Sequence, residues 1–281
     1  MSPVASALLL TAPAAVPLAV AGTYALPGLR PRRAAAVPAA ELTEARQRTT
    51  AQGATLVTEA PEPAQLPGRH GRDWVGLLSP AVILACGSLL AADVVEDGVR
   101  QAYSGLLRAD ALTAWMLLVV GAVALIACGS APAYLAGERT AGRASEQTVW
   151  RYHALVHAFL AAMCLAVTTA NLGVLWVAIE ATTIVTAFLV GHRRTRNSVE
   201  AAWKYVVICS AGIALAFLGT VLIYYAARQA GIAEAWALDW PTLVARADRL
   251  DPAVTRLGIT LIVLGFGAKA GLVPLPAWLP D

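Results

Sequence analysis

Seven apolar stretches, each long enough to cross a lipid bilayer, constrain the fold of this chain more than any other feature. A membrane-spanning helix needs about 20 mostly apolar residues. Stretches of this kind cover residues 4–26, 75–95, 109–131, 152–170, 172–191, 201–227 and 254–273. Their length favours helices, and no alternation of apolar and polar residues indicates strands. We therefore predict an all-α polytopic membrane protein with about seven transmembrane helices.

The composition supports a membrane protein and argues against several other classes. Only 14% of the residues are charged, against about 25% in a typical soluble domain. The net charge of +3 is spread over the loops and gives no reason to expect a nucleic-acid partner. The four cysteines lie singly in separate apolar stretches, at Cys86, Cys128, Cys164 and Cys209. Because no Cys-x-x-Cys pair occurs, we expect packing residues rather than a disulfide or a metal site.

Three regions follow from the distribution of polar residues. Residues 1–27 form the first transmembrane helix, and residues 74–281 form a transmembrane helical domain. Between them, residues 28–73 are rich in Pro, Ala, Arg and Glu, and we expect a polar, disordered loop. The basic cluster at residues 30–33 follows the first apolar stretch, whereas a signal peptide carries its positive charge before that stretch. We therefore expect the first helix to be retained.

Basic residues between the spans predict the orientation in the membrane, because cytoplasmic loops carry an excess of Lys and Arg. More arginines follow the odd-numbered spans than the even-numbered ones. Without the long first loop the two sides carry equal numbers, and the dense cluster HRRTR at residues 192–196 then decides. We predict a multi-pass protein of the plasma membrane, with its N-terminus outside and the loops after odd-numbered spans in the cytoplasm.

Two lysines and one glutamate stand out within the apolar stretches. Lys204 and Lys269 are the only lysines of the chain, and every loop cation is an arginine. A buried lysine can lose its proton, whereas an arginine stays protonated in essentially any protein environment. Glu180 lies near the middle of the fifth span. Because an ionisable group inside a membrane is costly and usually paired, we expect these three residues to form a chain of titratable groups.

Each of the three residues also has a purely structural interpretation. Glu180 can belong to an interhelical ion pair that only holds helices together. Lys204, near one end of the sixth span, can extend its amine toward the membrane interface. Lys269 can hydrogen-bond backbone carbonyls that the prolines after it leave free.

The sequence around Lys269 indicates a broken helix. The glycines and prolines near it are Gly265, Gly267, Gly271, Pro274, Pro276 and Pro280. Proline cannot sit in an unbroken helix, and transporters place ion sites where helices are broken within the membrane. We therefore expect a half-helix that ends near a protonatable amine. The alternative is an ordinary span whose end is anchored at the interface by Trp278.

Three stretches of the chain resemble a known family. They are WVAIEATTIVTAFLVG (176–191), SVEAAWKYVVICSAGIALAFLGTVLIYY (198–225) and LGFGAKAGLVPLPAWLPD (264–281). These stretches are similar to the antiporter-like, proton-conducting subunits of respiratory complex I (NADH-quinone oxidoreductase), of Mrp-type cation antiporters and of membrane-bound hydrogenases. EAAWKYVVICS looks most like hydrogenase-4 component F. The resemblance runs from about Leu106 to Asp281 and more loosely over the first two spans.

The resemblance implies a fold of two inverted five-helix repeats, of which this chain would hold the first. It also implies an ion pair between a glutamate on the fifth helix and a lysine on the broken seventh, which match Glu180 and Lys269. A further lysine on the sixth helix matches Lys204. The implied function is translocation of protons, or of sodium, driven by redox chemistry in other membrane subunits of a hydrogenase or complex I-like assembly. No cofactor and no catalytic centre of the chain's own are expected.

Two features depart from the family pattern. Pro276 stands where the family motif P-L-H-x-W-L-P-D has histidine, which puts a proton role of that position in question. The chain stops at Asp281, whereas family members continue through a second repeat. We therefore expect only the N-terminal half of such a subunit. A truncated membrane scaffold that transports nothing is the alternative function.

Two histidines and an aspartate complete the candidates. His153 and His157 are four residues apart at the start of the fourth span, a spacing that can hold a metal ion. No third ligand is visible, so interhelical hydrogen bonding is the expected role and a minor part in a proton path is the second option. Asp110 is expected to cap the third helix. An integral-membrane enzyme is the third function considered, and no nucleophile or metal constellation supports it.

Overall fold

The computed structural model describes residues 3–28, 75–142, 144–193 and 195–272. Within these ranges, seven helices are long and apolar enough to cross a membrane. They are α1 (Pro3–Gly28), α3 (Val75–Asp97), α4 (Ala111–Thr140), α5 (Glu146–Thr168), α6 (Leu172–Val190), α7 (Arg196–Gln229) and α9 (Pro252–Ala270). Each coincides with one of the seven predicted stretches, so the prediction of an all-α polytopic protein is confirmed. The predicted polar loop lies, apart from its first residue, outside the described residues.

Polar residues set the helix ends, and two helices extend well beyond their apolar stretches. α4 continues through Pro132 to Thr140, and α7 begins at Arg196 with a turn of polar residues that a hydropathy profile does not detect. Asp110 caps α4 as predicted, because its carboxylate accepts a hydrogen bond from the Thr113 N–H at 3.0 Å. Asn171 caps α6 in the same way, with its side-chain oxygen 2.9 Å from the N–H of Gly173.

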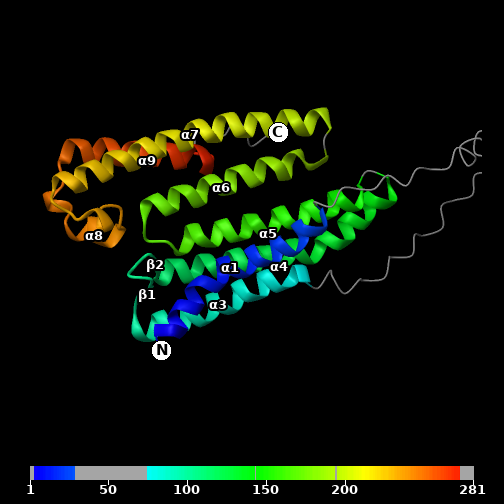
Figure 1. The fold of residues 1–281 in the computed structure, drawn as a ribbon, viewed down its shortest axis with the longest axis horizontal. Coiled ribbons are helices and arrows are strands. Elements are labelled where there is room, and N and C mark those ends of the chain that lie inside the picture. The colour runs from blue at the N-terminus through cyan, green and yellow to red at the C-terminus, as the bar shows by residue number, and fades with distance from the viewer. Residues whose placement is uncertain (1–2, 29–74, 143, 194, 273–281) are drawn as a thin grey trace, which may run out of the picture.

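The helices form a layered bundle in which neighbours along the chain mostly pack side by side (Figure 1). α9 packs on α7, α7 packs on α6, and α6 packs on α5. On its other side α5 contacts α1 and α4, and α3 closes the bundle against α1 and α4. This order places the two elements that follow the hairpin of α5 and α6, namely α7 and α9, at one edge of the bundle (Figure 1).

A small cap of short elements ties the two halves of the bundle together at one end. The strands β1 (Arg100–Ala102) and β2 (Leu107–Ala109) form an antiparallel hairpin. The short helix α8 (Trp240–Ala245) lies in the segment between α7 and α9. The link between α5 and α6 joins both, because the N–H of Ala170 donates to Leu106 and its carbonyl accepts from Trp240. The cap therefore fixes α6 against the helices on either side.

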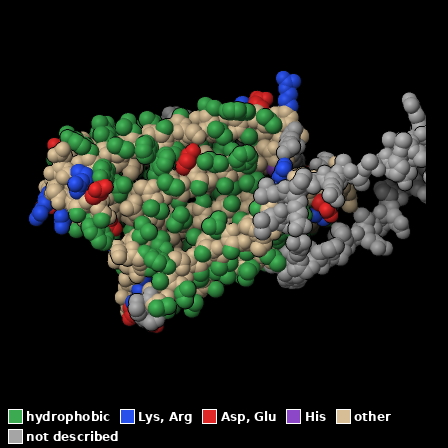
Figure 2. Space-filling model, in the orientation of Figure 1, with side chains coloured by type: hydrophobic (Ala, Val, Ile, Leu, Met, Phe, Trp, Pro, Cys, Tyr) green, Lys and Arg blue, Asp and Glu red, His purple; other side chains and the backbone are tan. Residues whose placement is uncertain are grey.

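The outer surface of the bundle is apolar over the flank shown in Figure 2, and most of the charged side chains on this face lie toward its ends. Large apolar side chains are exposed on several helices, such as Ile126 on α4, Phe188 on α6 and Trp203 on α7. Apolar side chains of this size face lipid rather than water in a membrane-embedded helix. The distribution matches the seven predicted spans.

Candidate ion-translocation site

Four glycines bring α7 and α9 into close backbone contact. A Cβ atom on Gly219 of α7 would lie 2.5 Å from the carbonyl oxygen of Gly258 on α9. Seven residues earlier on α7, a Cβ on Gly212 would lie 2.6 Å from the Cβ of Ala268 and 2.9 Å from the carbonyl oxygen of Gly265. Real Cβ atoms do not approach other atoms so closely, so no side chain larger than hydrogen fits at these positions. We call Gly212, Gly219, Gly258 and Gly265 the glycine seam.

The glycine seam positions Lys269, which lies one helical turn after Gly265 on α9. Because α9 lies so close to α7, the side chain of Lys269 reaches past α7 to α6. Its amine donates a hydrogen bond to the Thr183 hydroxyl on α6 at 2.6 Å. The Tyr205 hydroxyl on α7 lies 3.3 Å from the same nitrogen, and the backbone carbonyl of Ile179 lies at 3.4 Å.

Three oxygens and a ring therefore surround the amine of Lys269. The nitrogen also lies 5.8 Å from the centre of the Tyr205 ring, within the range of a cation–π interaction. None of the three oxygens carries a charge. A hydroxyl can accept a hydrogen bond from an ammonium group and can also donate one to a neutral amine. The surroundings of Lys269 thus suit both protonation states of the side chain.

Glu180 lies on α6 between Ile179 and Thr183, next to this amine. One of its carboxylate oxygens, Oε2, is buried and has no hydrogen-bond partner among the described residues. The two side chains are close enough to attract each other electrostatically. However, the ion pairs of the described residues, each with a nitrogen–oxygen distance of 4.0 Å or less, do not include one between Glu180 and Lys269. The Thr183 hydroxyl, rather than Glu180, makes the shortest contact with the amine.

Lys204 occupies a different environment. Its side chain is 45% exposed, and its amine lies 3.1 Å from Glu200, one turn earlier on α7. The next residue, Tyr205, is the one that faces Lys269. The structure therefore brings Glu180 and Lys269 together and places Lys204 on an outer face of α7.

The end of α9 agrees with the prediction of a helix that stops near Lys269. The helix ends at Ala270, one residue after the lysine. Gly271 follows with a φ of +75°, a left-handed conformation that glycine adopts at helix C-termini. A cation in the last turn of a helix is stabilised by the helix dipole. The predicted proline positions and Trp278 lie outside the described residues.

Sequence reasoning missed Thr183 and Tyr205, the two hydroxyls that hold the amine. Thr183 was detectable, because it follows Glu180 by three residues and so lies on the same face of a helix. Tyr205 could not be predicted from the sequence. Its neighbour Lys204 carries the charge, and the sequence alone does not tell which of these two side chains faces α9.

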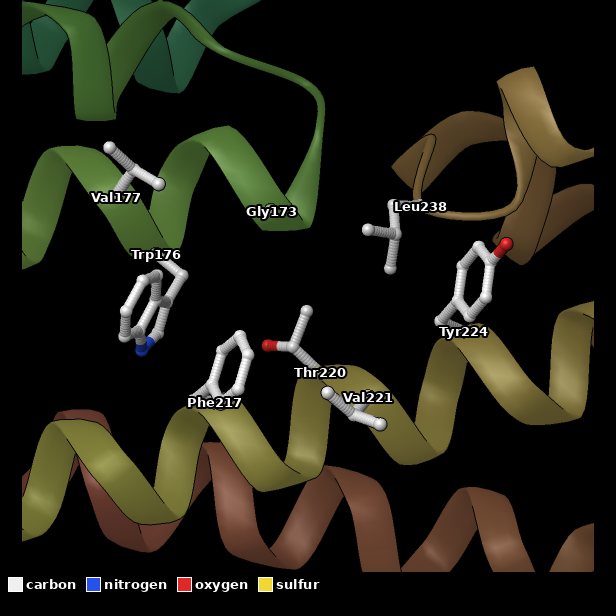
Figure 3. Close-up of a pocket in the computed structure, with 8 residues that line it drawn as sticks. All are labelled: Gly173, Trp176, Val177, Phe217, Thr220, Val221, Tyr224 and Leu238. Atoms are coloured by element: carbon white, nitrogen blue, oxygen red, sulfur yellow. The ribbon is translucent and has the colours of Figure 1, made fainter.

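A separate apolar groove of about 370 Å³ lies between α6 and α7 (Figure 3). Trp176 and Phe217 stand at one end, with ring centroids 4.7 Å apart, and Leu238 and Tyr224 stand at the other (Figure 3). The indole N–H of Trp176 donates to the backbone carbonyl of Ile213 at 2.9 Å, which joins the two helices. No charged side chain is among the residues that line the groove.

The two histidines of α5 lie in another part of the bundle. His153 and His157 both stack on Tyr24 of α1, with ring centroids 4.9 and 5.7 Å away. Among the described residues, no group of three His, Cys, Asp or Glu side chains is arranged to hold a metal ion.

Comparison with known proteins finds a family model that matches the part of the chain holding this site. Residues 169–281 match the model of the family described as NADH:quinone oxidoreductase/Mrp antiporter, TM. The matched part contains α6, α7 and α9, and therefore Glu180, Lys204 and Lys269. The chain is thus similar to antiporter-like membrane subunits over the part that holds the site, as the sequence motifs predicted.

The chain is similar in sequence to hydrogenase-4 component F and to NADH-quinone oxidoreductase subunit N. It is 40% identical over 148 residues to a hydrogenase-4 component F homolog of Methylacidiphilum infernorum (isolate V4). The matched region is 53% of this chain and 31% of the relative. It is 28% identical over 214 residues to NADH-quinone oxidoreductase subunit N 2 of Rhizobium meliloti (strain 1021), which covers 76% of this chain and 42% of the relative. The chain thus spans less than half the length of these relatives.

Two solved structures share the fold. One is the membrane-bound sulfane sulfur reductase, an archaeal respiratory membrane complex, with a TM-score of 0.66 and 20% identity over 100% of this chain and 47% of that one. The other is respiratory complex I from Thermus thermophilus with bound aureothin, with a TM-score of 0.56 and 22% identity over 74% of this chain and 40% of that one. At these identities the likeness concerns the arrangement of helices.

Proposed function

We propose that this chain translocates protons, or another small cation, across the membrane as a subunit of a redox-driven complex. The observation that carries the proposal is the half-buried amine of Lys269, held by the uncharged hydroxyls of Thr183 and Tyr205 beside the carboxylate of Glu180. An ionisable group at this depth is costly unless function requires it. The relatives named for hydrogenase-4 and for NADH-quinone oxidoreductase support the same function.

The proposed mechanism is an exchange of charge between Glu180 and Lys269. An ionised Glu180 stabilises Lys269 as a cation, and protonation or displacement of the carboxylate favours release of the lysine proton. The Thr183 hydroxyl can accept from the cation and then turn to donate to the neutral amine, so the amine keeps a hydrogen-bond partner in both states. The amine can therefore change its charge with no large movement of the helices.

Lys204 is the proposed relay residue between the pair and its surroundings. Its amine lies beside Glu200, so this role requires the side chain to leave Glu200 during transport. Tyr205 follows Lys204 directly on α7 and contacts Lys269 on α9, so Lys204 is one residue away from a direct neighbour of Lys269. Loss of transport in a Lys204→Ala variant would support the relay.

The proposed partners are the other membrane subunits of a hydrogenase or complex I-like assembly, and the chain itself has no redox role. The proposed location is the plasma membrane, with the N-terminus of α1 outside and the loops after α1, α4 and α6 in the cytoplasm. A membrane scaffold that transports nothing is the competing function, and a flux measurement separates the two.

The test uses the native complex reconstituted into vesicles that contain a pH-sensitive dye. Glu180→Gln and Lys269→Ala are each expected to abolish proton uptake while the complex still assembles. Glu234→Gln is the matched control, because Glu234 is exposed in the segment between α7 and α8. Uptake at the wild-type rate in both site variants would favour the scaffold and refute the exchange mechanism.

A further inference from the structure

A second buried polar group lies between α1, α3 and α5. His157 on α5 is fully buried, and neither of its ring nitrogens has a hydrogen-bond partner among the described residues. Its ring is almost parallel to that of Tyr24 on α1, with an angle of 7° between the planes. Stacking satisfies the faces of an imidazole but not its nitrogens. Because buried polar groups are nearly always hydrogen-bonded, His157 requires an explanation.

The space beside Gly76 of α3 is bordered by polar atoms. A Cβ atom built on Gly76 would lie 3.5 Å from the Tyr24 hydroxyl and 3.7 Å from Nε2 of His157. Among the described residues, and leaving out the adjoining residues of α3, no other heavy atom lies within 4 Å of that point. Gly76 thus presents no side chain toward a region that a phenol oxygen and an imidazole nitrogen both border.

Two further polar atoms near Gly76 each lack a hydrogen bond within the described part of the chain. Ser79, one turn further along the same face of α3, is fully buried, and its hydroxyl has no hydrogen-bond partner among the described residues. Pro80 has no N–H, so the carbonyl of Gly76 lacks the α-helical hydrogen bond that residue 80 would otherwise donate. A buried water molecule typically makes about three hydrogen bonds to groups of this kind.

We propose that Tyr24, Gly76 and His157 enclose a site for a bound water molecule, through which His157 takes up and releases a proton. The water donates to or accepts from each neighbour, because hydroxyls do both and a neutral imidazole has one donor and one acceptor nitrogen. The proton binds at a lone pair of the ring, and the water passes it on without any change in bonds between heavy atoms. The use of this proton in transport rests on the proposed function, whereas the site itself does not.

The site lies at the end of the bundle where α1 ends and α3 begins. Gly76 is the second residue of α3, and Tyr24 precedes the last residue of α1 by about one turn. This is the end that we predict to be cytoplasmic, so His157 would exchange protons with that side. Titratable groups on the helices that pack against α5, and on α5 itself, are Tyr24, Cys86, Asp93, Glu96, Asp97, Cys128, Tyr134, Glu138, Arg139, Glu146, Arg151, Tyr152, His153, Cys164 and Glu180.

Among these groups, only Tyr24 and His153 belong to the stacked cluster around His157 in the described structure. From Val75 to Ala92, α3 contributes no acidic or basic side chain. The exposed fraction of His157 is zero, so a proton reaches it only through hydrogen-bonded groups. The arrangement therefore favours relay through the bound water over direct contact with the solvent.

The test combines a spectroscopic measurement with one matched pair of glycine variants. In Gly76→Ala the new methyl group lies 3.5 Å from the Tyr24 hydroxyl and 3.7 Å from Nε2 of His157, where it crowds the proposed water, whereas in Gly22→Ala on α1 it meets nothing within 4 Å. Both are glycine-to-alanine changes within helices, so they share the effect on helix propensity. The full-length protein is labelled with ¹⁵N-histidine in lipid, and the His157 resonance is assigned by its loss in His157→Gln.

We expect the His157 resonance to titrate with pH, and to shift in Gly76→Ala but not in Gly22→Ala. Proton uptake is expected to fall about tenfold or more in Gly76→Ala and His157→Gln. If Gly76→Ala does not insert, Ser79→Ala is measured in its place. A His157 resonance that does not titrate, or that is the same in the two glycine variants, would overturn the proposal.

The same titration in a Lys269→Ala background separates this site from the proposed transport mechanism. The His157 resonance is expected to titrate there as in the wild type, even though uptake is lost. If Lys269→Ala takes up protons at the wild-type rate and its His157 resonance still titrates, the exchange mechanism is refuted and the proposed water site is not. Proton uptake at the wild-type rate in His157→Gln would refute only the role of His157 in transport.

Discussion

Replacing Gly265 by alanine is expected to separate α9 from α7 and to displace Lys269. A Cβ on Gly265 would lie 2.5 Å from the backbone nitrogen of Ala216 and 2.7 Å from its Cβ. An ordinary carbon contact is about 3.5–4.0 Å. Because the obstructing atoms are backbone and a Cβ, no side chain can rotate away, and the helices must move apart locally by roughly 1 Å.

The expected loss of stability follows from two opposing terms. Overpacking of a helix contact costs about 1–3 kcal/mol, and the rigid neighbours of Gly265 place it near the upper end of that range. Alanine regains about 1 kcal/mol through its higher helix propensity. The net loss is therefore about 2 kcal/mol, which corresponds to a fall of roughly 5 °C in the unfolding temperature of a protein of this size.

Transport is expected to suffer more than stability. Lys269 lies one turn after Gly265, and its amine is 2.6 Å from the Thr183 hydroxyl. A displacement of 1 Å breaks a contact of this length, and misplacement on that scale can reduce the rate of a positioned reaction by about a hundredfold. We expect proton uptake by the reconstituted complex to fall at least about tenfold in Gly265→Ala.

The assay compares thermal unfolding and proton uptake for Gly265→Ala and for Gly129→Ala. Gly129 lies within α4, and a Cβ there meets nothing within 4 Å, so this control is expected to unfold at or above the wild-type temperature with unchanged uptake. If Gly265→Ala matched the control in both measurements, the glycine seam would not position Lys269 and the argument would fail.

Three further predictions concern single contacts and the orientation. Thr183→Val keeps the shape of the side chain and removes its hydroxyl, and it is expected to lower proton uptake about tenfold because a hydrogen bond to a charged group is lost. Thr183→Ser keeps the hydroxyl and is expected to transport as the wild type does. Equal uptake rates in the wild type and both variants would show that the Thr183 hydroxyl has no part in transport. Arg100→Ala is expected to lower the unfolding temperature by several degrees, because Arg100 pairs with Asp93 and Asp97 and anchors the hairpin to α3; an unchanged thermogram would show that the hairpin needs no anchor. A membrane-impermeant thiol reagent added to intact cells is expected to label Ser104→Cys in the hairpin and not Ala141→Cys after α4, and the reverse pattern would invert the proposed orientation.

The sequence was sufficient for the transmembrane spans and for the residues that carry charge. A span of about 20 apolar residues leaves few alternatives to a helix, and charged residues inside such spans are rare enough to stand out. Glu180 and Lys269 were predicted to be neighbours on these grounds, and the structure places them on facing parts of α6 and α9.

The details of the site depended on contacts that a sequence does not specify. The family resemblance implied an ion pair between Glu180 and Lys269, yet the uncharged Thr183 makes the shortest contact with the amine. Lys204 was expected beside the pair because of its charge, but α7 presents Tyr205 to Lys269 instead. Rotation of a helix about its axis decides such questions, and it depends on packing across the glycine seam.

Several features outside the site were also beyond prediction from the sequence. The β1–β2 hairpin is too short to give a periodic pattern, and its turn contains two non-glycine residues with positive φ, Tyr103 and Ser104. The first turn of α7 is polar and was assigned to a loop. The hairpin is held by hydrogen bonds to a distant part of the chain, and the first turn of α7 is held by a capping side chain, Thr195.

The substitution Lys269→Arg tests the central claim most directly. Arginine keeps the positive charge and can hydrogen-bond the same oxygens, but it does not release its proton in a protein. If Lys269 must alternate between charged and neutral forms, the Lys269→Arg complex will assemble in the membrane and show no proton uptake in vesicles. Uptake at the wild-type rate would mean that a fixed positive charge is sufficient, and the proposed exchange of a proton at this residue would be wrong.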